Sequence, residues 1–127
     1  MITSQFVKVT TTGGAGASAG ANRVQFVGKI LSVTLFPGAA SPVTMDTVVT
    51  ITENGVSTND IETVASFTNI GNAAGITKRY PRKELDDGLG SSLGFFEPFV
   101  TTSGIEVTVS QADDEEPAAI IEVIYEE

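Results

Sequence analysis

The sequence contains no cysteine and no histidine. Without cysteine there are no disulfides and no thiol nucleophiles, and without either residue the usual ligands of zinc and iron sites are missing. The missing histidine also removes the side chain that titrates near neutral pH, which excludes a Ser-His-Asp triad. Catalysis would have to depend on carboxylates, lysines or tyrosines, and we predict that the protein is not an enzyme and uses no cofactor.

Long apolar runs are absent as well. No stretch approaches the roughly 18 apolar residues of a membrane-spanning helix, so we predict no membrane partner. Residues 1–6 carry neither the basic segment nor the apolar segment of a signal peptide, which predicts a protein made and kept in a cytosol.

Charge is distributed unevenly along the chain. Residues 1–83 carry seven basic and four acidic side chains, a net charge of +3. Residues 84–127 carry twelve acidic side chains and no basic one, so the sum of +3 and −12 is the net charge of −9. Nucleic-acid binding needs clustered Lys and Arg to neutralise phosphates, and this composition predicts no nucleic-acid partner.

Short segments of high β-propensity recur along the chain with turn signals between them. No segment shows a sustained helical period with capping residues. A chain of 127 residues forms one domain around one core. We therefore predict an all-β fold over residues 1–127: a single antiparallel β-sandwich, jelly-roll or Ig-like, with about eight short strands. The clearest strand segments are 2–12, 23–36, 47–53, 61–67, 105–110 and 120–125.

Three of these segments and the linker between the first two allow more specific predictions. In 23–36 the apolar residues change parity between Ile30 and Leu31, which predicts a β-bulge or a change of strand partners. Gly28 predicts a bend or a close approach of another backbone. Segment 120–125 is apolar on both parities and is predicted to be central, whereas 2–12 is predicted to lie at an edge. Residues 13–21 (GGAGASAGA) cannot bury apolar area, and a flexible small-residue loop is predicted there.

The stretch from Lys78 to Gly90 holds four of the seven basic residues. Its proline forbids a central strand, and glycines at 88 and 90 permit a sharp reversal. We predict an ordered functional loop over residues 78–94 as the working surface, with a solvated loop that binds nothing as the alternative. Arginine suits bidentate recognition of a carboxylate, and tyrosine provides an anchor of low conformational entropy. The candidate interface residues are Lys78, Arg79, Tyr80, Pro81, Arg82, Lys83, Asp86 and Asp87.

The clusters of phenylalanine and of acidic residues are predicted to have structural roles and not binding or catalytic ones. Three rings in five residues, Phe95, Phe96 and Phe99, predict core and edge packing in place of an exposed patch, because ring burial is the largest apolar gain available. The acidic run 113–116 lacks the alternating ligand spacing of a calcium loop, so we predict a solvated hairpin tip and no metal site. Glu84 and Glu97 lack the aromatic-lined cleft of a glycosidase, and no catalytic residue is predicted.

Several features follow one another along the chain. They are the small-residue loop, the run 27–33, a strand led by Asp46, Tyr80-Pro81-Arg82 with Asp87 and Gly90, the run 97–100, the run 104–111 and the terminal run 123–127. In this order they resemble small virion proteins from the structural-gene clusters of tailed bacteriophages, and among these the capsid decoration, or cement, proteins.

The resemblance implies a small β-sandwich that binds the outer surface of a phage capsid as a homotrimer and reinforces capsomer joints. It implies the major capsid protein and other copies of this chain as partners, and a location on the capsid exterior of the virion after synthesis in the bacterial host cytoplasm. It implies no catalysis and no cofactor, and it marks Arg82, with Tyr80 and Pro81, as the recurring loop.

Two alternatives stay open. A head–tail connector or tail accessory protein is another structural role in the same particle, and it would form rings of six or twelve copies. A carbohydrate- or host-surface-binding β-sandwich module would expose aromatic side chains in a shallow groove and would be stabilised by glycans.

Overall fold

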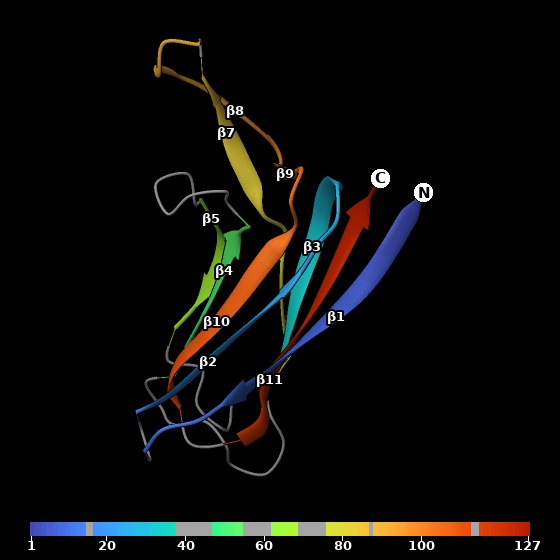
Figure 1. Ribbon diagram of the computed structural model, residues 1–127. Coiled ribbons are helices and arrows are strands. Elements are labelled where there is room, and N and C mark those ends of the chain that lie inside the picture. The colour runs from blue at the N-terminus through green and yellow to red at the C-terminus, as the bar shows by residue number, and fades with distance from the viewer. Residues whose placement is uncertain (15–16, 38–46, 55–61, 69–75, 87, 113–114) are drawn as a thin grey trace.

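The computed structural model describes residues 1–14, 17–37, 47–54, 62–68, 76–86, 88–112 and 115–127. Within these ranges the chain forms eleven strands and no helix, and every strand pairing is antiparallel (Figure 1). The all-β class is confirmed, and the strands exceed the predicted eight. The described residues contain no helix long and apolar enough to cross a membrane. The strands are β1 (Ile2–Thr11), β2 (Ser18–Val24), β3 (Gly28–Pro37), β4 (Val48–Glu53), β5 (Thr63–Phe67), β6 (Thr77–Arg79), β7 (Arg82–Asp86), β8 (Ser92–Pro98), β9 (Val100–Thr101), β10 (Ile105–Ala112) and β11 (Glu115–Glu126).

The five-stranded sheet has the order β1-β11-β3-β6, and β9 pairs with β3. The first and last strands are neighbours, and the Glu127 N–H donates to the Met1 carbonyl oxygen (3.1 Å). The predictions of a central strand near the C-terminus and an edge strand near the N-terminus are both confirmed. Along β11, buried Ile121 and Val123 alternate with partly exposed Ile124 on the opposite face, as expected when only one face of a sheet is packed.

The predicted bulge lies in β3. Ile124 pairs with Ser32 and Tyr125 pairs with Ile30, so Leu31 is an extra residue on β3. The bulge changes the parity of the strand, and it brings both Ile30 and Val33 into the core with no exposed area.

The segment predicted as one strand over 23–36 is two strands in the structure. β2 ends in the four-stranded sheet at Val24, and β3 begins in the five-stranded sheet at Gly28, so the chain crosses between sheets at residues 25–27 (Figure 1). An added Cβ at Gly28 would lie 2.5 Å from the Glu126 carbonyl oxygen, which confirms the predicted close approach of another backbone.

The four-stranded sheet has the order β2-β10-β4-β5. Residues 18–21 belong to β2, so the prediction of a loop over 13–21 is wrong for them. An added Cβ at Gly20 would overlap the Thr10 carbonyl, and Ala19 forms a β-bridge with Thr12. The small residues therefore allow β1 and β2 to approach closely, which a composition-based prediction of flexibility does not consider.

Residues of both larger sheets contribute to one hydrophobic cluster. Its largest fully buried side chains are Ile30, Leu35, Ile51, Ile105, Ile121, Val7, Val9, Val33, Val49, Val107, Val109 and Val123. Close to the chain termini, the rings of Phe26 and Tyr125 stack with centroids 4.1 Å apart, and Gln5 Nε2 donates to the Tyr125 hydroxyl (2.8 Å).

A third sheet consists of β7 and β8 alone. It projects beyond the ends of the two larger sheets, at the end of the molecule where the two termini lie (Figure 1). We call β7, residues 88–91 and β8 the β-arm.

Candidate functional site

The predicted interface stretch forms the root and the first strand of the β-arm (Figure 1). The structure corrects the predicted loop over 78–94: Lys78 and Arg79 lie in β6, Arg82 begins β7, and Ser92 begins β8. The backbone is extended here because β7 and β8 pair with each other, which satisfies the backbone groups that face the partner strand.

Two of the predicted basic residues contact aromatic rings near the root. The Arg79 guanidinium carbon lies 5.2 Å from the centroid of the Phe67 ring, and this buried ring belongs to the four-stranded sheet. Arg79 therefore connects the edges of both sheets through a cation–π contact. Lys78 Nζ lies 5.7 Å from the centroid of the Tyr80 ring, and Tyr80 itself is 62% exposed.

The remaining predicted residues lie where β7 leaves the body of the protein. Pro81 is buried and fixes the direction of the chain, whereas Arg82 and Lys83 are exposed. Lys83 Nζ donates to both carboxylate oxygens of Glu62 (2.9 and 3.0 Å), but this pair is half exposed and contributes at most about 1 kcal/mol. Within the described ranges Arg82 forms no ion pair.

Asp86 is the last residue of β7, where its backbone pairs opposite Ser92, and Asp87 lies outside the described residues.

The β-arm displays large apolar side chains that the sequence did not predict to be exposed. Leu89 is 91% exposed, Leu93 50%, Phe95 68% and Phe96 61%. The predicted packing of three phenylalanines is therefore right for Phe99, which is 5% exposed, and wrong for the other two. Neighbouring residues in a strand point to opposite faces, and neither face of the β-arm is covered by the larger sheets.

A bulge shapes the β-arm. Glu84 pairs with Phe96 and Asp86 pairs with Ser92, so the three residues 93–95 lie opposite Leu85 alone. Gly94 has a positive φ of 73°, and its N–H donates to the Ser92 hydroxyl (3.2 Å), which in turn donates to the Glu84 carboxylate. These local contacts define the shape of the β-arm within the chain itself.

Phe99 and the turn after β9 anchor the root of the β-arm. The Phe99 carbonyl accepts a hydrogen bond from the N–H of Ile30 (2.7 Å). The Thr101 hydroxyl, which is buried, accepts from the N–H of Gly104 (3.0 Å). Gly104 has a φ of 94° and leaves no room for a Cβ beside the Val24 carbonyl. The segment 99–104, which follows the β-arm, is therefore fixed to the body of the protein.

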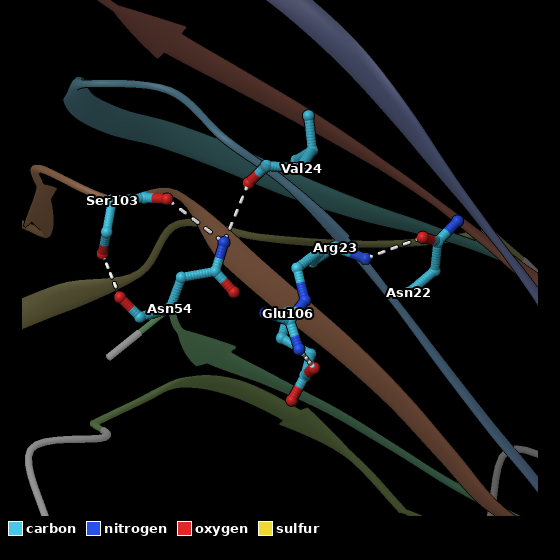
Figure 2. A network of polar contacts seen from close by, with 6 residues as sticks. All are labelled: Asn22, Arg23, Val24, Asn54, Ser103 and Glu106. Carbon is cyan, nitrogen blue, oxygen red and sulfur yellow. Dashed lines mark hydrogen bonds and ion pairs between the residues drawn. The ribbon is translucent and has the colours of Figure 1, made fainter. Parts of the chain in front are cut away.

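Asn54 holds this turn against the neighbouring strands (Figure 2). Its Nδ2 donates to the Val24 carbonyl (3.2 Å) and to the Ser103 carbonyl (3.1 Å), and the Ser103 hydroxyl donates back to the Asn54 carbonyl. One amide thereby joins the ends of β2, β4 and the turn before β10. Further along the same sheet, Arg23 and Glu106 form an exposed ion pair at 3.0 Å (Figure 2).

A hollow of about 370 Å³ lies beside the root. It is lined by Glu62, Thr63, Arg82, Lys83, Glu84 and Phe99. Its walls mix both signs of charge, so it presents no single-sign field for a charged small ligand. In the part of the chain that the structure describes, no three acidic side chains are grouped to hold a metal ion.

Comparisons with known protein families, with curated proteins and with solved structures found no match to this chain.

The residues that the sequence singled out lie at the root and along the first strand of the β-arm, but the exposure of its apolar side chains was not predicted. A signal was present, since adjacent Phe95 and Phe96 cannot both face one packed side of a strand. The prediction failed because a core was assumed on at least one side of this strand, and the structure places it in a ribbon with no core.

Proposed function

We propose that this chain is a structural virion protein that associates into a trimer on the outer surface of a phage capsid and reinforces the joints between capsomers. In this proposal the two larger sheets are the layers of a β-sandwich, and the β-arm is the element that makes the assembly contact. The observation that carries the proposal is the display of four large apolar side chains on a projecting two-stranded ribbon.

An isolated two-stranded hairpin is marginally stable in water, and apolar patches on monomeric proteins rarely exceed a few hundred Å². Exposed Phe95 and Phe96 contribute nothing to the core of their own domain. Contact with another protein surface gives these side chains a role, because removing them from water in an interface is favourable.

The root supports the same proposal. Buried Pro81 and Phe99 and the Asn54 hydrogen bonds hold the β-arm in one direction, as an assembly contact between repeated copies requires. A glycan-binding module is less well supported, since Phe95 and Phe96 lie on a projecting ribbon and sugar-stacking rings line a groove.

The first test is the solution mass by light scattering over a range of salt concentrations, followed by co-sedimentation with capsids of the phage that encodes the chain. We expect a species of about 40 kDa, three times 13.2 kDa, and sedimentation with the capsids. Rings of six or twelve copies would favour the connector alternative. A monomer that does not bind capsids and is stabilised by glycans would contradict the proposal.

A matched pair of variants tests the β-arm. Phe95→Ser combined with Phe96→Ser should abolish association while the protein stays folded by circular dichroism, because both rings are exposed. Val27→Ser is the control, since Val27 is 61% exposed and lies outside the β-arm. Equal loss of association in both variants, or in neither, would count against the β-arm as the assembly element.

A further inference from the structure

We infer that the β-arm of one copy docks on the outer face of the five-stranded sheet of a second copy. This inference rests on the proposed function and identifies the surface that receives the β-arm.

The outer face of the five-stranded sheet is the second apolar surface of the chain. Val7 and Val9 of β1 point into the core, whereas Ile2 and Phe6 point outward and are 62% and 58% exposed. The other outward apolar residues belong to neighbouring strands, and we call the whole set the outer patch. The outer patch consists of Ile2, Phe6, Phe36, Ile120 and Ile124.

The strand register brings these apolar residues close together, with polar Ser4 and Glu122 between them. Ile2 and Phe6 are exposed, and the other three are partly exposed. Ile120 pairs with Phe36 on one side of β11, and Ile124 pairs with Ser4, which lies between Ile2 and Phe6 on β1. The rings of Phe6 and Phe36 are 6.4 Å apart between centroids. A sheet face in contact with water normally carries polar side chains, so this apolar band departs from the usual alternation.

The β-arm and the outer patch are different surfaces of one chain, and a head-to-tail contact covers both. An arm-to-arm contact would leave the outer patch in water, and a face-to-face contact would leave the β-arm in water. Head-to-tail contacts close into a ring when the rotation between copies permits, which is the symmetry of a trimer.

The areas agree with a contact of ordinary size. Taking about 200 Å² for a whole side chain, the exposed parts of Phe95 and Phe96 amount to on the order of 250 Å². A specific interface buries about 800 Å² on each partner, so the two rings can form the centre of an interface completed by the strands around them.

Charge favours the same pairing of surfaces. Glu122 of β11 points outward beside Phe6, and within the described ranges it forms no ion pair. Arg82, at the base of the β-arm, is exposed and also lacks an ion pair there. A contact that brings these charges together fixes the orientation of the β-arm and weakens as salt is added.

Cross-linking of single-cysteine variants tests the inference, since the chain has no cysteine of its own. Ser91→Cys labels the β-arm, Ser4→Cys labels the outer patch, and Ser66→Cys is the control because Ser66 is an exposed serine on β5 of the other sheet. The Ser91→Cys chain is mixed with a mass-tagged chain carrying one of the other two variants, and the mixture is oxidised in solution and on capsids.

We expect the mixed disulfide between Ser91→Cys and Ser4→Cys to form on the order of 100-fold faster than that with Ser66→Cys, because docked thiols meet at about millimolar effective concentration in a solution of about 10 µM protein. Equal rates for Ser4→Cys and Ser66→Cys would overturn the inference, and so would faster formation of the Ser91→Cys homodimer, which would indicate arm-to-arm contact.

The outcomes separate this inference from the proposed function. Trimers that bind capsids but give no preferential product with Ser4→Cys overturn the docking surface and leave the decoration role in place. Chains that neither associate nor bind capsids overturn both. Charge reversal provides a second readout: Arg82→Glu should weaken association at low salt, and added Glu122→Arg should restore it.

Discussion

Three phenylalanines within five residues should respond very differently to replacement by alanine. Phe99 is 5% exposed, whereas Phe95 and Phe96 are 68% and 61% exposed. Truncation of a buried phenylalanine removes its transfer free energy and leaves a cavity, at a cost of about 3–5 kcal/mol. We therefore expect Phe99→Ala to lower the free energy of unfolding by about that amount.

Truncation of the two rings of the β-arm should lower the free energy of unfolding much less. Their buried fractions are 32% and 39%, the complements of the exposed fractions. Full burial of a phenylalanine contributes about 1.5–3 kcal/mol, so these fractions correspond to at most about 0.5–1.2 kcal/mol each. Phe95→Ala and Phe96→Ala should therefore cost less than half as much as Phe99→Ala.

Urea unfolding followed by circular dichroism measures the difference. With a slope of about 1–3 kcal/mol per molar urea, Phe99→Ala should lower the midpoint by at least about 1 M. The protein should be kept near about 1 µM, since association would stabilise the wild-type chain and hide the intrinsic effect. If Phe95→Ala or Phe96→Ala destabilised the protein as much as Phe99→Ala, the β-arm would have to pack against its own domain, and the proposed assembly contact would lose its basis.

Three further predictions concern backbone and side-chain contacts near the root of the β-arm and the ion pair of Lys83. Asn54→Ala removes two hydrogen bonds from the amide to backbone carbonyls and should cost about 1–3 kcal/mol in urea unfolding. Gly104→Ala places a Cβ against a carbonyl in a backbone of positive φ and should lower the free energy of unfolding by more than about 2 kcal/mol. Gly88 also has a positive φ but lies in open space, so Gly88→Ala should lower it by only about 1–2 kcal/mol. Equal effects of the two substitutions would show that the crowding at Gly104 is relieved at no cost. A double-mutant cycle on Lys83 and Glu62 should give a coupling below about 1 kcal/mol that disappears in about 1 M salt, and a larger, salt-resistant coupling would mean that the pair is more buried than its half-exposed side chains indicate.

The decisive local information was the pattern of apolar and polar residues along each strand. It identified the β class, the central position of β11, the edge position of β1 and the bulge at Leu31. Each of these depends on how many residues of one strand are apolar and on which sides they lie, and neighbouring residues of the sequence carry that information. The basic root of the candidate site was likewise visible as a cluster of charges around a proline.

Only the tertiary structure decided which surfaces are covered. The small residues of 18–21 are paired in β2 because β1 approaches them closely, although the same composition is typical of flexible linkers. Phe95 and Phe99 have the same side chain four residues apart, yet one lies on a ribbon without a core and the other belongs to the hydrophobic core. Burial depends on contacts between distant segments, and the period of a single strand carries no information about them.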